Sequence, residues 1–130
     1  MTLTKIIRAD RPGKYTKIYT LLHSRPDTAK RLNIRAIVQN GADLTVTGMI
    51  HILPTAPRSD SFLDIRVLIL DSNSRADVRP QLEIETNDVK ASHAATIGPI
   101  DPEQLFYLQS RGLNYAQAQK LIVAGFLSHA

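Results

Sequence analysis

Short strand-like segments separated by polar turns fill most of this chain and restrict the folds open to it. From about residue 14 to residue 70, apolar residues alternate with polar ones, and β-branched and aromatic residues are frequent. One face of the strand predicted over 44–53 holds Leu44, Val46, Gly48, Ile50 and Ile52. Such a succession is typical of a β-sandwich, a β-barrel or a parallel β-helix. Periodicity does not choose among them, and the absence of a strict sequence repeat counts against a regular solenoid.

Polar connectors set the expected boundaries of these strands. The segment NGAD, at 40–43, contains residues that tolerate a positive φ and predicts a tight turn after a strand over 32–39. The segments PTAPRSDS and DSNSRADVRP predict two loops, with the strand FLDIRVLIL between them. The segment QLEIETNDVKASHAAT then predicts two short strands, divided by a turn at Asn87 and Asp88.

The pattern becomes helical after Gly98. Asp101 is a predicted N-cap, with proline at the first helical position and Gln104 placed to complete a capping box, and Gly112 is expected to end this helix. Asn114 caps a second predicted helix. The apolar residues of the two helices are expected to face one another: Leu105, Phe106, Leu108, Ala118, Leu121, Ile122 and Phe126. We therefore expect a strand-rich region over 1–98 and a helical hairpin over 99–130, forming one structural unit.

Composition excludes several classes of protein. Hydrophobic residues make up 43% of the chain, which is a globular value, and no apolar run approaches the roughly 18 residues of a membrane-spanning helix. The first residues lack the apolar segment of a secretion signal, so we expect a cytoplasmic protein. The absence of cysteine excludes disulfides, thiolate ligands and a cysteine nucleophile in this chain.

Positive charge is concentrated near the N-terminus. Residues 1–40 hold nine Lys/Arg and two Asp, whereas residues 41–130 hold seven Lys/Arg and ten acidic residues. A basic segment can bind nucleic acid or an acidic partner. However, no RNA-binding signature, helix-turn-helix spacing or aromatic stripe accompanies the charge, so a solvated surface is the favoured interpretation.

The last third of the chain carries an ordered set of motifs. They are P-x-L-E-I, DVKASH, AT-x-G, D-x-E-Q-L-F-Y-L-x-S-R-G and a downstream A…LI…GF, over about residues 80–127. This set resembles the SufB/SufD family of iron–sulfur cluster assembly scaffolds. The resemblance implies a mainly β fold, namely a right-handed parallel β-helix followed by a C-terminal two-helix hairpin. It also implies that two scaffold subunits join through their β-helix ends, and that the helical segment docks a SufC-type ABC ATPase.

The resemblance is closer to the SufD-like members. The segment Ser92-His93-Ala94, together with the absence of cysteine, is similar to the SufD-like motif. The family more usually has glycine at position 94. By this resemblance His93 is a ligand or proton carrier in cluster formation at the subunit interface. The alternative is a structural strand histidine.

Further site residues come from the same region. Glu83 and Glu85, which share one strand face, are candidates together with His93 for the cluster or interface site. They could bind a hard cation or relay protons, whereas a structural role at the junction with the helices is the simpler interpretation. His23 and His51 are too isolated in sequence to predict a metal site. On the hairpin, the resemblance makes Tyr107, Arg111 and Asn114 candidates for docking the ATPase. For Arg111 the alternative is a favourable interaction with the helix C-terminus.

These observations predict a non-catalytic scaffold subunit. The chain lacks a G-x-x-x-x-G-K-[ST] loop, so any ATP hydrolysis belongs to a partner. The implied partners are the ABC ATPase, a SufB-like subunit or a second copy of this chain, and indirectly a cysteine desulfurase. No cofactor is expected on the chain alone, only a transient Fe–S cluster at a subunit interface. The alternatives are an oligomerisation module without a cluster role and a basic nucleic-acid-binding module.

Overall fold

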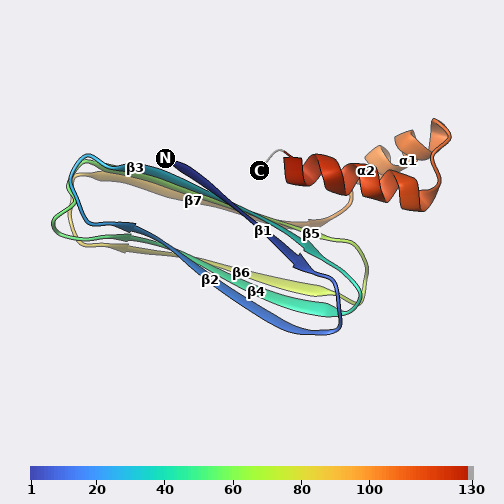
Figure 1. Ribbon diagram of the computed structural model, residues 1–130, viewed down its shortest axis with the longest axis horizontal. Helices are drawn as coiled ribbons and strands as arrows, with labels where there is room; N and C mark the ends of the chain where they lie inside the picture. The colour runs from blue at the N-terminus through green and yellow to red at the C-terminus, as the bar shows by residue number, and fades with distance from the viewer. Residues whose placement is uncertain (129–130) are drawn as a thin grey trace.

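Seven strands and two helices make up residues 1–128, which are the residues that the computed structural model describes. The strands are β1 (Thr2–Ala9), β2 (Gly13–His23), β3 (Ala29–Val38), β4 (Ala42–Ile52), β5 (Ser59–Ile69), β6 (Arg75–Ile84) and β7 (Val89–Pro99). The helices are α1 (Pro102–Ser110) and α2 (Tyr115–Ser128). Figure 1 shows two layers of strands, with the helices outside the layer that contains β7. None of these helices is long and apolar enough to cross a membrane.

Successive strands alternate between two parallel sheets. The strand order is β1-β3-β5-β7 in sheet A and β2-β4-β6 in sheet B, and each strand pairs in parallel with the strand two places along the chain. The chain therefore winds as a solenoid, in which one turn consists of a strand from each sheet. This confirms the predicted parallel β-helix with two C-terminal helices and excludes an antiparallel sandwich or barrel.

The length of a turn varies, which explains why the sequence shows no strict repeat. Thr2 pairs with Arg31, Arg31 with Phe62, and Phe62 with Ser92, at offsets of 29, 31 and 30 residues. The extra residues lie in the corners between the sheets. Strand pairing therefore stays in register while the sequence period drifts.

The corners are tied together by side chains. Asn40 (φ 60°) and Gly41 (φ 80°) adopt the left-handed conformation that the sequence predicted for this turn. The Asn40 amide N–H donates to the Asp71 carboxylate at 2.7 Å, and its side-chain amide donates to the Asp10 carbonyl at 2.9 Å. Hydrogen bonds from the Ser74 hydroxyl and the Asn40 N–H lower the pKa of Asp71. Corners of successive turns thus stack on one another as the strands do.

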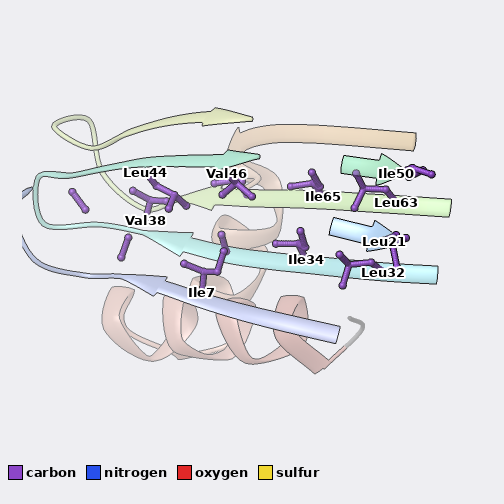
Figure 2. Close-up of a cluster of buried hydrophobic side chains, with 14 of the residues drawn as sticks. Ile7, Leu21, Leu32, Ile34, Val38, Leu44, Val46, Ile50, Leu63 and Ile65 are labelled. Carbon is purple, nitrogen blue, oxygen red and sulfur yellow. The ribbon is translucent and has the colours of Figure 1, made fainter. Parts of the chain in front are cut away.

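Alternate residues of both sheets point inward and form the core between the layers (Figure 2). The five residues predicted to share one face of the second strand are all buried. Gly48 is one of them, and a Cβ at this position would lie 2.7 Å from Leu63 Cδ2 of the opposite sheet. Side chains of the opposite sheet thus occupy the space that a side chain at position 48 would need.

Two strand boundaries differ from the prediction. Strand β1 was not anticipated, and β6 begins at Arg75, inside the segment expected to be a loop. Charged residues at alternate outward positions and Pro80 masked this strand. Proline is tolerated there because β6 is an edge strand, where a missing N–H costs no ladder bond inside the sheet.

The helical hairpin forms over the predicted residues, with one capping difference. Asn114 and Gln117 form the complete capping box, with reciprocal bonds of 3.0 and 2.8 Å. At the first helix, Asp101 accepts from the N–H of Glu103 at 2.9 Å rather than from that of Gln104. Both helix starts are nevertheless capped by the side chains that the sequence identified.

The packing of the two helices differs from the expectation at two positions. Ala118 and Ile122 of α2 are buried, as predicted, and Gly112 follows α1 with φ 99°. Phe106 and Leu121, however, are 72% and 53% exposed, so they do not pack between the helices. The hairpin buries only a narrow strip against sheet A and leaves apolar side chains in solvent.

Candidate functional site

The last turn of the solenoid, formed by β6 and β7, exposes the side chains that continue the core. Ile84 pairs with the buried Ile52 but is 39% exposed, and Leu82 pairs with the buried Ile50 but is 45% exposed. Ile97 on β7 is likewise 45% exposed. The inward-facing rows thus end in an apolar surface, which we call the open end.

His93 lies in this open end. It pairs with the fully buried Leu63, so its side chain occupies an inward-facing position of β7, yet it is exposed because no further strand of residues 1–128 covers it. The residues two places away on the same face, Ala91 and Ala95, are small. The histidine is therefore accessible to a second backbone approaching this end.

The predicted pair Glu83 and Glu85 lies on the outer face of sheet B. His51 Nε2 lies 3.0 Å from a carboxylate oxygen of Glu85 and 3.9 Å from one of Glu83. The sequence prediction missed His51, because the register that brings it opposite Glu83 spans 32 residues. Comparing polar residues that lie about one solenoid turn apart in the sequence could have identified His51 as the partner of Glu83.

The structure does not bring the predicted cluster residues together. His93 faces inward on sheet A, whereas Glu83 and Glu85 face outward on sheet B. The three residues lie near the same end of the solenoid but cannot ligate one ion within one chain. Within one chain, His93 and the two glutamates therefore belong to separate sites.

The hairpin residues predicted for docking lie near its loop. Tyr107 is 54% exposed, and the Arg111 guanidinium lies over its ring at 5.2 Å from the centroid. Asn114 is exposed, although its side chain already caps α2. Because Phe106 and Tyr107 are adjacent, one was expected to face the core and the other an interface, but both are exposed. The result is an exposed aromatic surface with one arginine, a composition that is enriched in protein–protein interfaces.

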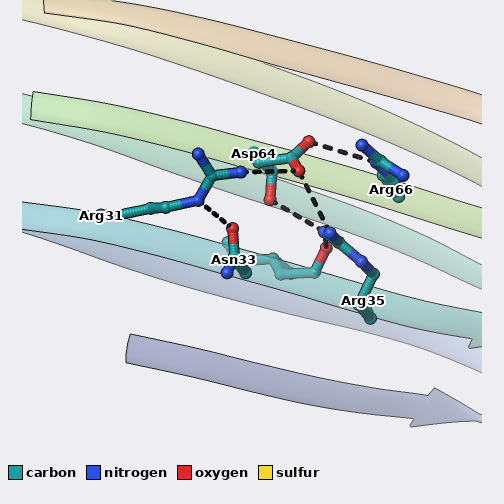
Figure 3. A network of polar contacts seen from close by, with 6 residues as sticks. Arg31, Asn33, Arg35, Asp64 and Arg66 are labelled. Atoms are coloured by element: carbon teal, nitrogen blue, oxygen red, sulfur yellow. Dashed lines mark hydrogen bonds and ion pairs between the residues drawn. The ribbon is translucent and has the colours of Figure 1, made fainter. Parts of the chain in front are cut away.

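A charged network on the outer face of sheet A surrounds a buried carboxylate (Figure 3). Asp64 is 2% exposed, and its carboxylate lies 3.1 Å from Arg35, 3.4 Å from Arg66 and 3.5 Å from Arg31. Arg35 is itself 3% exposed and also donates to the carbonyls of Asp64 and Ile34. Sequence reasoning missed this network, because charged residues at outward positions look like a solvated surface.

A second buried polar group is His23, at an inward position of β2. Its Nδ1 lies 2.8 Å from the Thr28 hydroxyl, which in turn contacts Ser59 at 3.0 Å, and its buried Nε2 has no hydrogen-bond partner. Burial, together with the positive charge of Lys30, lowers the pKa of His23. The ring is therefore neutral and structural rather than a candidate catalyst.

Comparison with known proteins extends the similarity over almost the whole chain. A family model described as the SufBD core domain of SUF system FeS cluster assembly matches residues 2–126. The iron–sulfur cluster assembly protein SufD of Escherichia coli (strain K12) is 37% identical over 106 residues, which cover 82% of this chain and 25% of that protein. An iron–sulfur cluster assembly SufBD family protein of Staphylococcus haemolyticus is 32% identical over 107 residues, which cover 82% of this chain and 23% of that protein.

The chain thus spans about a quarter of the length of these curated relatives. The match begins in β1, so it includes the strand-rich region that the motifs of the last third did not reach. The matched residues fold as the parallel solenoid and the two helices that follow it. On these findings, the chain belongs to the SufBD family.

Proposed function

We propose that this chain acts as a non-catalytic scaffold subunit in iron–sulfur cluster assembly. In this role it pairs with a second scaffold through the open end and docks an ABC-type ATPase through its helical hairpin. The partner scaffold is a SufB-like subunit or a second copy of this chain. The family membership supports the pathway, and the observation that carries the proposal is the exposure of His93 among apolar, inward-facing positions.

The open end suits pairing with another β-helix. Strands β6 and β7 are edge strands, so each presents unpaired backbone groups beside exposed apolar side chains. A second solenoid placed against them would continue both the hydrogen-bond ladders and the core. Pairing would also enclose His93 between two chains.

The chemistry expected of His93 is that of a ligand or proton carrier. The chain has no cysteine, so the thiolates that hold an Fe–S cluster must come from the partner. A neutral imidazole can bind iron or exchange protons near pH 7. Iron and sulfide, the latter supplied indirectly by a cysteine desulfurase, are cargo rather than a resident cofactor of this chain.

The hairpin suits docking of the ATPase because its loop region is both ordered and apolar. Capping fixes the start of α2, while Phe106, Tyr107 and Tyr115 remain more than half exposed. A hollow of about 580 Å³ lies between the end of β7 and the first residues of α1, and its lining is mostly apolar. Together these surfaces offer a contact area on the hairpin that adjoins the open end at Ile97.

Co-purification with a SufB-like scaffold and an ABC-type ATPase tests the two contacts separately. We expect Tyr107→Ala combined with Arg111→Ala to abolish recovery of the ATPase and to leave the scaffold pair intact. Thr16→Ala, an exposed change on the outer face of sheet B, is the matched control. Unchanged recovery of the ATPase with the double variant would refute the docking assignment.

Cluster formation in the reconstituted complex tests His93. We expect His93→Ala to lower the yield of cluster while pairing persists, and Ser92→Ala, on the opposite face of β7, to leave the yield unchanged. Equal yields for both variants would reduce the chain to an oligomerisation module. Light scattering separates the two forms of pairing, because a monomer at tens of micromolar would exclude the homodimer.

A further inference from the structure

Strand register brings three metal-binding side chains to one place on the outer face of sheet B. His51 of β4 is the direct register partner of Glu83 of β6. Glu85 follows two residues later on the same face, and its N–H donates to the Ile52 carbonyl at 2.9 Å, which extends the strand ladder beyond Ile84. The backbone therefore holds all three positions of this His51–Glu83–Glu85 cluster.

The ligand atoms of the cluster have the spacing of a coordination sphere. One nitrogen of His51 and one oxygen from each glutamate all lie within 4.8 Å of one another, and the closest pair is 3.0 Å apart. A metal ion about 2.0–2.2 Å from each ligand needs separations of about 3–3.5 Å, so only small side-chain rotations would close the site. The side chains are 25%, 55% and 42% exposed, which leaves an ion access from solvent.

The negative charge of the two carboxylates in the cluster also favours binding of a cation. Among residues 1–128, no side-chain nitrogen of an arginine or lysine lies within 4.0 Å of either glutamate carboxylate, and the ion-pair partner of both is His51. Asp27, Asp64 and Asp77, in contrast, each contact an arginine. Two carboxylates converging on one imidazole without a basic side chain form an arrangement that a divalent ion would neutralise.

We infer that the His51–Glu83–Glu85 cluster binds one divalent first-row transition metal ion, such as Fe²⁺, Co²⁺ or Zn²⁺. One imidazole nitrogen and two carboxylate oxygens provide three ligands, and water completes the coordination. Imidazole favours these ions over Mg²⁺, which prefers oxygen ligands and retains its water. The site is separate from His93 and does not depend on a role in cluster assembly.

Titration of this chain with Co²⁺ tests the site, because ligand-field absorption reports nitrogen and oxygen coordination directly. We expect one equivalent of Co²⁺ to bind, Zn²⁺ to displace it, and millimolar Mg²⁺ to leave it in place. His51→Gln, Glu83→Gln and Glu85→Gln should each raise the Kd for Co²⁺ by at least about tenfold. Circular dichroism checks that each variant keeps its fold.

Two controls isolate the cluster from other polar groups. Asp77→Asn removes an exposed carboxylate from the same face of β6, where it pairs with Arg79, and should leave the Kd unchanged. His93→Ala should also bind Co²⁺ normally. Loss of binding in either control to the same extent as in the cluster variants, displacement by Mg²⁺, or no binding by the unsubstituted chain would overturn the inference. None of these outcomes bears on pairing or ATPase docking.

Discussion

The middle turns of the solenoid, formed by β3, β4 and β5, and its last turn, formed by β6 and β7, carry the same pattern in different surroundings. In the middle turns the inward-facing apolar residues are mostly buried, and two charged residues on the outer face of sheet A, Arg35 and Asp64, are also covered. In the last turn, inward-facing isoleucines and leucines remain about 40% exposed. The contrast shows that the same alternating pattern gives buried side chains where a strand lies on each side, and exposed apolar side chains in the last turn, where no further strand of residues 1–128 covers them.

The largest expected difference concerns ion pairs. Arg35→Ala should lower the free energy of unfolding by about 3–5 kcal/mol, because it removes the best-placed partner of the buried Asp64 carboxylate. Arg79→Ala breaks a pair with Asp77 in which both side chains are more than half exposed, and should cost about 1 kcal/mol or less. Urea unfolding of both variants measures the difference. Similar losses would mean that burial does not distinguish the two turns.

A matched pair of isoleucines sharpens the comparison within the core. Ile52 and Ile84 are register partners on adjacent strands, with exposures of 0% and 39%. Ile52→Ala should cost about 2–5 kcal/mol, because it leaves a cavity, whereas Ile84→Ala should cost roughly 1 kcal/mol in the isolated chain. If the open end pairs with a second scaffold, Ile84→Ala should additionally weaken that association. A loss for Ile84→Ala as large as for Ile52→Ala, in a chain shown to be monomeric, would contradict this account.

The smallest expected effect is a pH dependence of stability that arises from the buried His23. Because the pKa of His23 is lowered by folding, the unfolded state takes up a proton first, and stability falls as the pH drops below about 6.5. The slope is at most about 1.4 kcal/mol per pH unit. His23→Gln should remove this slope, whereas Ser92→Ala, which replaces an exposed residue that does not titrate, should leave it unchanged. Unfolding titrations between pH 7.5 and 5 decide the matter, and an unaltered slope in His23→Gln would refute the assignment.

Local signals predicted much of the fold. Alternation identified most of the strands, and capping residues placed both helices, because these features depend on neighbours in sequence. The winding into a solenoid came from the family resemblance instead. Parallel pairing at offsets of about 30 residues leaves no local trace, and the varying corners remove the regular repeat.

The candidate site was predicted less completely. Glu83, Glu85 and His93 were identified in sequence, but the partner of the two glutamates was not, because His51 lies on another strand. The buried Arg35 and Asp64 were missed for a related reason. Their outward positions are polar in any strand pattern, and nothing local indicates that the hairpin and neighbouring side chains cover them.

The stacking of each turn on its neighbours has a consequence for how the chain folds. Each strand pairs only with the strands one turn before and after it, so a turn gains its stability from adjacent turns rather than from the molecule as a whole. Folding of such a solenoid starts where two turns first pair and then spreads to the neighbouring turns. Amide protons of β3, β4 and β5 should therefore exchange with solvent most slowly, and those of the edge strand β7 should exchange faster. The surface proposed to receive a partner would then also be among the last to become ordered.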